Sequence, residues 1–556
     1  MLELKGGEYF KARAYKLGAR SVAELPEDLG KLIKQNRLTF VKGIGYTLAK
    51  QIEELYTTGQ SSFLNQLRDE MPPGIVELSG VPGLNVKKVQ LLHEALGITT
   101  IGELKAAAAA GKLRDIKGFG ARSEARILEA ISGSENRHER RIHIHHALRA
   151  GERILEYLET SRAFQRAELA GALRRWKETV SQIVVVASAK RPHSLLEHFL
   201  RFPMVKRVVE QTSDRAVVLL SEGFQATLIV VTPAEFAMAL FNATGSRAHL
   251  RKLNELAVNG KLKTRAKRRG KSSAVTDVKS EAQIYQRLGM QFVPPELRED
   301  QGEIEAARAG KIPEDLVSVG DIRGMVHCHT TYSDGKHSVE QMVAAAEALG
   351  MKYITITDHS PSAFYAGGVK IDRLQRQWEE IDEVQEKTKV RILKGTESDI
   401  LADGSLDYPD RILEQFDVIV ASIHARYKMD ESKMTQRIIT AMRQPVFKIW
   451  GHALGRLIQK RPPFDCRVEE ILDVIAESRA AVEINGDPYR LDMEPRWLRQ
   501  ARKRKIKFVV SVDAHSTGAL NNVKFGIGIA RRAGVRRVEV LNTLGVKAFQ
   551  KTVRPV

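Results

Sequence analysis

The sequence has little cysteine and no long apolar segment. Its two cysteines, Cys328 and Cys466, cannot build a disulfide framework, and they are too few for a structural zinc site made of thiolates alone. No apolar run approaches the roughly 20 residues that span a bilayer, and no signal peptide opens the chain. These absences predict a soluble protein of the reducing cytoplasm with no membrane partner.

Acidic residues are also in deficit. The chain has 88 lysines and arginines against 68 aspartates and glutamates, which gives a formal net charge of +20 and a pI near 9.7. A basic excess of this kind favours a polyanionic partner such as nucleic acid. Because 556 residues are too many for one hydrophobic core, the length predicts three or four domains.

The C-terminal part of the sequence repeats one pattern. Seven short apolar runs, rich in β-branched residues, lead into polar residues of which nearly all are types that bind metals. These residues are His327 with His329, His359, Glu397, His424, His452, Asn485, and Asp513 with His515. Segments of helical length separate most of the runs, so the pattern predicts parallel strands closed into a barrel. The polar residues then lie at the C-terminal strand ends, where such barrels keep their functional groups.

The first of these runs predicts a metal centre. His327 and His329 alternate along one strand, so both imidazoles face one side and Cys328 faces the other as a buried small residue. Glu397 and Asp513 can add oxygen ligands, and a mixed nitrogen and oxygen set suits zinc, manganese or iron rather than calcium. A lone histidine after an apolar run is more often a capped or core residue. The repetition of this placement favours a catalytic metal cluster instead.

These motifs resemble the PHP (polymerase and histidinol phosphatase) family over about residues 320–556. The match rests on His-x-His-x4-Asp from His327 to Asp334, and on five further motifs: Thr357-Asp-His-Ser360, Gly395-Thr-Glu397, Ser422-Ile-His424, Gly451-His452 and Asp513-Ala-His515. The resemblance implies an α/β barrel of seven strand-helix units that holds three divalent metals, with nine ligands: His327, His329, Asp334, His359, Glu397, His424, His452, Asp513 and His515.

The resemblance also implies how the ligands are shared. By the family pattern, His327, His329, Glu397 and Asp513 hold one ion and are the expected catalytic residues. Glu397 bridges to a second ion held by His424 and His452, while Asp334, His359 and His515 hold the third. Neighbouring metals can lower the pKa of a bound water and clamp the oxygens of a phosphoester. Arg456 is a candidate for contact with a phosphate oxygen; the alternative for Arg456 is a solvated surface arginine.

The N-terminal part carries three similar glycine turns between helical segments, at 41–45, 81–85 and 116–120. They resemble the helix-hairpin-helix motif, in which glycines let backbone N–H groups approach a phosphate at a helix N-terminus. A tight turn between helices explains one copy equally well, but three copies favour DNA backbone contact that is independent of sequence. The expected contacts are Gly43, Gly45, Gly83, Gly118 and Gly120.

Taken together, these segments resemble family X DNA polymerases of the bacterial type along almost the whole chain. Further matches are 4–15, Gly171–Thr179, Thr244–His249 and Pro295–Glu299. The resemblance implies a multi-domain chain: a lyase-like helical domain (1–62), a fingers-like helix-hairpin-helix domain (63–140), an α+β palm (141–232), a thumb (233–318) and the PHP barrel (319–556). The match begins late in the first helix of the family, so we expect the start to be either trimmed or misassigned.

The palm departs from the family pattern. Polymerases of this family hold two magnesium ions on three carboxylates, and the corresponding positions here are Gln182, Val184 and Thr227. Residues 180–190 contain no acid at all. We therefore expect no magnesium in the palm and no polymerase activity.

Two other N-terminal features bear on DNA. The basic run 261–271 includes Lys267, Arg268 and Arg269, which either contact DNA or form a solvated loop. Gln51 stands where eukaryotic relatives have a Schiff-base lysine. Lys50 adjoins it, but one residue along a helix rotates the side chain by about 100°, so we expect no lyase activity.

These features lead to one hypothesis and three alternatives. The chain is expected to be a DNA-repair enzyme whose PHP domain removes nucleotides from 3′ ends, with abasic-site cleavage or removal of 3′ blocking groups left open. The alternatives are a phosphomonoesterase of the histidinol-phosphatase kind, a DNA-binding scaffold without activity, and a residual polymerase. Expected partners are gapped, nicked or 3′-ended DNA and a separate repair polymerase or ligase. We expect a monomer in the bacterial cytoplasm, associated with the nucleoid.

Overall fold

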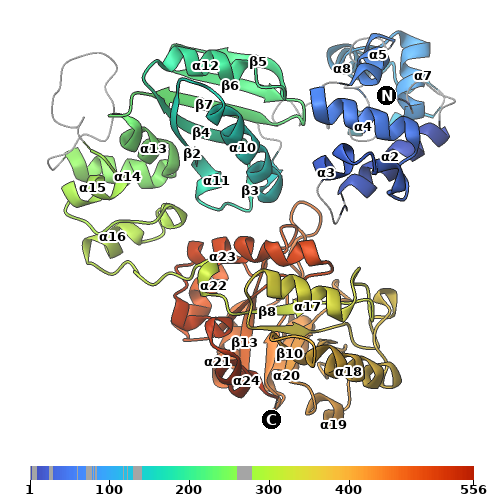
Figure 1. Ribbon diagram of the computed structural model, residues 1–556, viewed down its shortest axis with the longest axis vertical. Coiled ribbons are helices and arrows are strands. Elements are labelled where there is room, and N and C mark those ends of the chain that lie inside the picture. The colour runs from blue at the N-terminus through green and yellow to red at the C-terminus, as the bar shows by residue number, and fades with distance from the viewer. Residues whose placement is uncertain are drawn as a thin grey trace. The chain divides into compact units, whose positions relative to one another are not determined.

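The computed structural model divides the chain into two compact units, Met1–Arg140 and Arg141–Val556 (Figure 1). It describes residues 2, 9–23, 25, 29–58, 61–70, 78, 81, 84, 86–116, 118–121, 123–128, 141–258 and 278–555. Among these residues, no helix is both long enough and apolar enough to cross a membrane.

The first unit is helical, as the sequence predicted. Its described helices are α2 (Tyr9–Ala23), α3 (Leu29–Lys34), η1 (Leu38–Phe40), α4 (Tyr46–Thr58), α5 (Ser62–Asp69), α7 (Val86–Leu96) and α8 (Ile101–Ala109). One small core packs Leu32 and Leu38 against Ile44, and a second packs Leu92 against Leu104. Thr100 and Glu103 form a capping box that begins α8. The first glycine turn thus lies between the short helices η1 and α4.

The second unit begins with an α+β region. A five-stranded sheet has the order β2-β4-β7-β6-β5, in which β4 and β7 are parallel and the other pairs antiparallel. The elements are α10 (Ile144–Glu159), β2 (Phe164–Ala170), α11 (Gly171–Arg174), β4 (Gln182–Ala189), α12 (Pro192–Leu200), β5 (Val205–Gln211), β6 (Arg215–Leu220), β7 (Gln225–Val231) and α13 (Phe236–Thr244). The short strands β1 (Ile142–His143) and β3 (Thr179–Val180) pair separately. Ile183 and Val185 belong to the core that includes α10 and α12, whereas Val186 packs with Phe236 of α13.

A small helical region follows the sheet. It contains α14 (Arg247–Val258), α15 (Glu281–Arg287), η2 (Pro295–Leu297) and α16 (Glu303–Arg308). Polar contacts of two buried glutamates, Glu281 and Glu303, stabilise it. Glu281 contacts Arg174 at 2.7 Å and also contacts the fully buried Arg298. His249 Nδ1 lies 2.5 Å from Glu303. The region is therefore tied to the palm sheet by charge as well as by packing.

The last region is a nearly closed parallel barrel (Figure 1). Its seven strands pair in chain order: β8 (Gly324–Cys328), β9 (Tyr353–Ile356), β10 (Arg391–Asp399), β11 (Val418–Ser422), β12 (Lys448–Trp450), β13 (Ala480–Asn485) and β14 (Phe508–Ser511). A parallel bridge between Cys328 and Ala514 joins the first and last strands. The surrounding helices are α17 (Val339–Ala348), α18 (Ile371–Gln385), α19 (Asp410–Leu413), α20 (Glu431–Arg443), α21 (Val468–Glu477), α22 (Pro495–Lys503), α23 (Val523–Arg532) and α24 (Val546–Val553). The predicted barrel of seven strand-helix units is confirmed.

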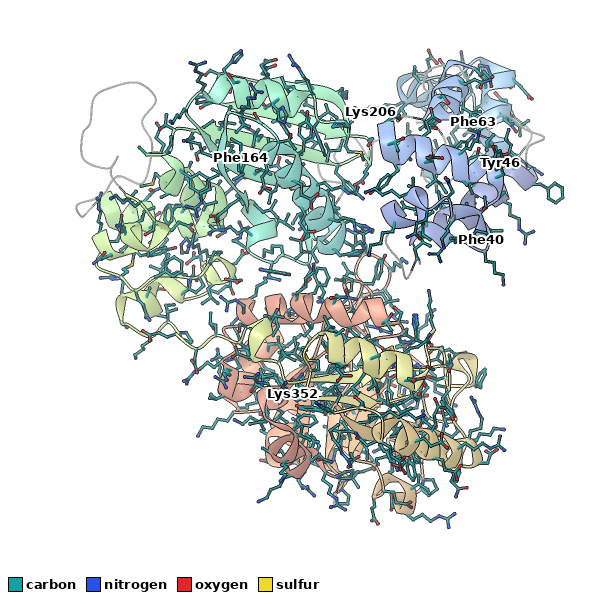
Figure 2. All side chains as sticks on the ribbon, viewed as in Figure 1. Phe40, Tyr46, Phe63, Phe164, Lys206 and Lys352 are labelled. Atoms are coloured by element: carbon teal, nitrogen blue, oxygen red, sulfur yellow. The ribbon has the colours of Figure 1, made fainter. Side chains whose placement is uncertain are left out.

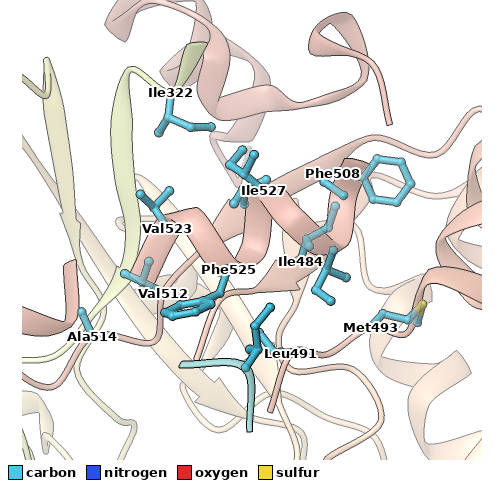
Figure 3. Close-up of a cluster of buried hydrophobic side chains, with 14 of the residues drawn as sticks. Ile322, Ile484, Leu491, Met493, Phe508, Val512, Ala514, Val523, Phe525 and Ile527 are labelled. Atoms are coloured by element: carbon cyan, nitrogen blue, oxygen red, sulfur yellow. The ribbon is translucent and has the colours of Figure 1, made fainter. Parts of the chain in front are cut away.

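Two apolar layers hold the barrel. Figure 3 shows the outer one, where Ile484 and Phe508 of the strands pack against Ile527 of α23. The inner layer includes Tyr353 at the start of β9, on which Phe549 of α24 stacks with ring centroids 4.7 Å apart. Because Tyr353 begins its strand, α24 covers the N-terminal strand ends. The C-terminal ends are left for polar residues.

The barrel and the palm share one hydrophobic core. Trp176 of the palm packs against Phe525 of α23 with ring centroids 6.1 Å apart. The next turn of α23 carries Gly528, where a Cβ atom would collide with the Trp176 ring, so only glycine lets the helix approach this closely. The ion pair of Arg531 with Glu296 of η2, at 2.6 Å, also joins the barrel to the helical region that follows the sheet.

Candidate metal centre

The nine predicted metal ligands lie together at the C-terminal ends of the barrel strands. Three of them have a left-handed backbone, with φ of +66° at His327, +23° at His452 and +49° at Asp513. Residues other than glycine rarely adopt this backbone conformation. Where they do, the surrounding structure enforces it, most often at functional sites. The chain thus bends sharply at the strand ends and turns these three side chains toward the barrel mouth.

Three overlapping groups of ligand atoms lie within 4.8 Å of one another. They are His327 with His329, Glu397 and Asp513; His359 with Glu397 and His424; and His329 with Asp334, His359 and His515. The first group equals the expected one. The others differ in detail, because His359 joins Glu397 and His424, and His329 joins the third group. His452 falls outside the second group, although its Nε2 lies 2.8 Å from Glu397 Oε1.

Glu397 is the centre of the arrangement and is 1% exposed. Its Oε1 lies 3.2 Å from His327 Nε2 and 3.3 Å from His424 Nε2. Its Oε2 lies 2.9 Å from His359 Nδ1 and 3.5 Å from His329 Nε2. One carboxylate therefore faces separate groups of imidazoles with its two oxygens, which is the geometry of a bridging ligand.

The chemistry of these atoms fits a metal centre. The His327 Nε2, both ring nitrogens of His329, the His359 Nδ1 and one Glu397 oxygen are buried without a hydrogen-bond partner. A buried polar atom left unpaired costs about 1–3 kcal/mol, so several converging ones need a common explanation. Nitrogen and carboxylate donors at such spacing suit zinc, manganese or iron. Metal binding would satisfy these atoms together.

Further carboxylates orient the imidazoles from behind. Glu483 lies 2.5 Å from His327 Nδ1, and Asp399 lies 2.6 Å from His424 Nδ1. Such partners fix the ring orientation of a metal-binding histidine and raise its basicity. Glu483 also accepts hydrogen bonds from Ser511 and from the His452 backbone N–H. Sequence reasoning missed both acids, although each stands two residues from an expected strand-end residue and so faces the same side of its strand.

The pKa values reflect an excess of negative charge at the centre. Burial lowers the pKa of His424, but Glu397 and Asp399 outweigh it and raise that pKa to about 10. Burial opposes ionisation of Glu397, yet His327 and His424 hold its pKa well below the usual value. His329, by contrast, has a pKa lowered to about 3 by burial and by His515 and His359. A cation bound by Glu397, Asp513 and the imidazoles would compete with protons for these groups.

Arg456 does not reach the cluster. It is 5% exposed, so it is not a solvated surface arginine either. Its guanidinium contacts Glu178 of the palm at 3.0 Å and Glu494 at 3.4 Å. Both partners lie outside the ligand set, and the contact joins barrel to palm.

Arg490 is the arginine that meets the cluster. Its Nε lies 3.2 Å from Asp513 Oδ2, and one terminal nitrogen is buried without a partner. Nothing in the sequence marked it, because it follows β13 by five residues on a loop whose direction the sequence does not give.

The palm positions expected to lack acids lie side by side. Val184 of β4 pairs with Thr227 of β7, and the Thr227 hydroxyl donates to Gln182 Oε1 at 2.9 Å. Glu168 lies on the same face, since it pairs with Val186, but Arg166 contacts it and Arg174 lies 3.4 Å away. This acid is therefore already neutralised.

The hairpin glycines are described in part. Gly43 and Gly118 have φ of +90° and +98°, and a Cβ on Gly45, Gly118 or Gly120 would meet nothing within 4 Å. The exposed rings of Phe40 and Tyr46 flank the first turn (Figure 2). The backbone there is open to a large ligand. Gly83 and the basic residues Lys267, Arg268 and Arg269 lie outside the described residues.

Gln51 stands where the family's lyase lysine was expected, and its side chain is held in a hydrogen bond. Its side-chain oxygen accepts a hydrogen bond from Tyr15, while the neighbouring Lys50 lies over the Tyr46 ring at 5.1 Å. The two side chains thus point to different partners, as their helical offset predicted.

Comparison with known proteins agrees with this architecture. Residues 326–487 match the PHP domain family and 239–299 the DNA polymerase beta thumb. Residues 1–61 match a helix-hairpin-helix domain, and 75–132 match a SAM-like helix-hairpin-helix tandem. The fold and site thus define a polymerase-type chain that carries a phosphoesterase barrel.

Relatives cover both the whole chain and the barrel alone. The chain is 33% identical to the DNA polymerase/3′-5′ exonuclease PolX of Bacillus subtilis (strain 168), across 98% of this chain and 95% of that one. It belongs to the family X DNA polymerases with a C-terminal PHP domain. A probable phosphatase of Thermoanaerobacter sp. (strain X514) is 28% identical across 39% of this chain and 89% of its own.

Proposed function

We propose that this chain shortens DNA from its 3′ ends by phosphodiester hydrolysis in the PHP barrel, and that it does not extend them. The observation that carries the proposal is the convergence of histidines and acids on the buried Glu397. The membership of the chain in a family that includes a DNA polymerase/3′-5′ exonuclease supports DNA as the substrate.

In this proposal the nine ligands hold three divalent ions, which are zinc, manganese or iron. The ions supply a water of lowered pKa and neutralise charge on the phosphate. Each oxygen of Glu397 faces imidazoles of more than one group, and Glu483 and Asp399 keep the imidazoles of His327 and His424 oriented. Arg490 takes the role that the sequence suggested for Arg456. Its unpaired nitrogen can donate to a phosphate oxygen, while its Nε holds Asp513.

The remaining domains position DNA. We assign 1–62 and 63–140 to the two helix-hairpin-helix domains, 141–232 to the palm, 233–318 to the thumb and 319–556 to the barrel. Gly43, Gly45, Gly83, Gly118 and Gly120 let backbone N–H groups meet phosphates, and Lys267, Arg268 and Arg269 add charge. The palm holds no magnesium, because a glutamine, a valine and a threonine replace its acids. In the bacterial cytoplasm, at the nucleoid, a separate polymerase or ligase would complete repair by this monomer.

A nuclease assay tests this proposal. A 5′-labelled single strand is incubated with Mn²⁺ and wild-type protein, and in parallel with the Asp513→Asn/His515→Ala variant. His193→Ala is the matched control, because this histidine is exposed and lies on α12 of the palm region. Wild type and control should shorten the strand, and the double variant should not. Equal shortening by the double variant would contradict the proposal.

A second candidate is a phosphomonoesterase. The relatives that match the barrel alone include proteins described as probable phosphatases, which favours this reaction for the same ligands. Comparing hydrolysis of p-nitrophenyl phosphate with shortening of DNA separates the two. Turnover of the small ester without any shortening of DNA would select the phosphatase.

A further inference from the structure

Two large aromatic side chains stand exposed beside the metal centre. Phe364 is 86% exposed and Tyr365 61% exposed, on the single turn η4 (Phe364–Ala366) that follows His359. The Tyr365 ring centroid lies 6.2 Å from that of His359 and 6.3 Å from that of His424. Both histidines belong to the cluster around Glu397. The aromatic pair therefore borders the place where a phosphate would be hydrolysed.

The loop that carries these rings is firmly held. Ala363 and Ala366 are 1% and 4% exposed, so the small residues of the turn are packed inward. The Val369 N–H donates to the His359 carbonyl at 2.7 Å, which closes the loop at its base. The Ser362 N–H donates to Asp407 at 2.6 Å. The rings are thus exposed on a fixed support, which lowers the ordering cost of binding a ligand.

The two rings extend from the cluster outward. Tyr365 is the inner ring, because its centroid lies within 6.3 Å of two histidines of the cluster. Phe364 meets Tyr365 edge to face, with centroids 6.3 Å apart and planes at 77°. Neither ring is covered by the other, because exposure remains high at both. A flat apolar group beside the phosphate would find two aromatic surfaces available.

Cations and aromatic rings also alternate elsewhere around the loops of the barrel mouth. Arg461 lies over the Tyr427 ring at 4.0 Å, and Lys460 lies over the Tyr489 ring at 5.7 Å. Tyr427 follows His424 by three residues, and Tyr489 adjoins Arg490. Aromatic surfaces mixed with positive charge are typical of sites that bind single-stranded nucleic acid.

We propose that Phe364 and Tyr365 form a nucleobase-binding subsite, on which the base of the 3′-terminal nucleotide stacks while its phosphate occupies the metal cluster. The inference rests on the proposed nuclease function and adds to it that the terminal nucleotide is bound unpaired. A base on these rings gives up stacking on its neighbours but keeps an aromatic contact. A protein seated on the rings would instead cover His359 and His424 and block the cluster. This is why a base, rather than a protein surface, is assigned as occupant.

The test removes the rings and, separately, the base. Wild type and the Phe364→Ala/Tyr365→Ala variant are compared on two single strands that differ only at the 3′ end. One ends in thymidine, and the other in a tetrahydrofuran abasic nucleotide that has no base to stack. Stacking is worth about 1–3 kcal/mol per base, so kcat/KM of the variant on thymidine should fall about 5- to 100-fold. On the abasic end, wild type and variant should agree within about twofold.

Conservative variants separate the ring from other causes. Tyr365→Phe keeps the aromatic surface and should retain most activity on thymidine, while Phe364→Ala alone should show part of the loss. Val538→Ala removes an exposed apolar side chain elsewhere on the barrel and should change nothing.

Three outcomes would overturn the subsite. They are an equal loss on both ends, no loss on either end, and a large loss in Tyr365→Phe. Failure of the wild type to shorten either strand would overturn the proposed function itself, so the two failures are distinguishable.

Discussion

At the residue scale, the metal centre depends on carboxylates that bind no metal themselves. Glu483 accepts hydrogen bonds from His327, Ser511 and the His452 backbone, and Asn485 donates to it at 3.0 Å. Glu483 accepts in every one of these hydrogen bonds. Only an ionised carboxylate can do so, because a protonated one would have to donate its own hydrogen. Its pKa is accordingly lowered, because His327 and His452 outweigh the effect of burial.

Replacing Glu483 with glutamine should loosen the centre. The amide NH₂ of the glutamine cannot accept a hydrogen bond, so one of the groups that donate to Glu483 would lose its partner. His327 should then lose its fixed orientation, and metal affinity or activity should fall about 10- to 100-fold. Metal content by elemental analysis and kcat on single-stranded DNA measure both effects. Glu477→Gln, on the exposed end of α21, is the matched control. Unchanged metal affinity and activity in Glu483→Gln would show that the carboxylate does not orient His327.

The two arginines should respond in opposite ways. Arg490→Gln should lower kcat about 10²- to 10³-fold with little loss of metal, because it removes a cation at the cluster. Arg456→Gln should leave kcat within a few-fold but destabilise the second unit by about 3 kcal/mol, because Glu178 loses a buried partner. Thermal unfolding and kinetics on the same preparations test this pair. A large loss of kcat in Arg456→Gln, with only a loss of stability in Arg490→Gln, would show that Arg456 is the catalytic arginine.

At the element scale, the barrel was the most predictable part of the chain. The strands are mostly buried, and most are rich in β-branched residues. Parallel pairing puts all C-terminal ends at one mouth, so motifs far apart in sequence converge. The sequence could not show which acids stand behind the ligands, because Glu483 and Asp399 look like ordinary polar residues of their strands. Asn485 ends a predicted run like the ligands do, but its amide supports Glu483 instead. Arg456 was misleading because closeness in sequence to His452 does not give the direction of a loop.

The joint between palm and thumb depends on a buried ionised group. Burial opposes ionisation of Glu281, but Arg174 and Arg298 outweigh it and lower its pKa below the usual value near 4.5. Arg298 is 0% exposed and Glu281 8% exposed, so neither charge is compensated by water.

Glu281→Gln should therefore destabilise the second unit by about 3–5 kcal/mol at neutral pH. Because the pKa of Glu281 is lower in the folded chain than in the unfolded chain, its ionised form stabilises the fold at pH values above the unfolded-state pKa. This stabilisation is lost as the pH falls through the folded-state pKa. The difference in Tm between wild type and variant should be largest near pH 7 and shrink below about pH 4. Glu314→Gln changes an exposed glutamate nearby and serves as control. A difference that does not depend on pH would exclude an ionised Glu281.

At the scale of the whole molecule, the chain combines the domains of a family X polymerase with a PHP barrel. Along the chain, two helix-hairpin-helix matches are followed by the polymerase beta thumb match and then by the PHP domain match. In the palm, Gln182, Val184 and Thr227, which are expected from the sequence at the positions of the polymerase acids, lie on neighbouring strands, and the Thr227 hydroxyl donates to Gln182. In the barrel, eight of the nine expected ligands fall into three overlapping groups that could hold a metal, and the ninth, His452, lies 2.8 Å from Glu397. Under the proposed function, synthesis and hydrolysis depend on different residues.

One measurement tests this separation most directly. The Asp513→Asn/His515→Ala variant is given a 5′-labelled primer on a longer template with Mg²⁺ or Mn²⁺ and all four nucleotides, so that no degradation hides extension. The primer should keep its length with the variant, and wild type under the same conditions should shorten it. A primer that grows longer with the variant would contradict the account, because it would show that the palm still transfers nucleotides without its acids.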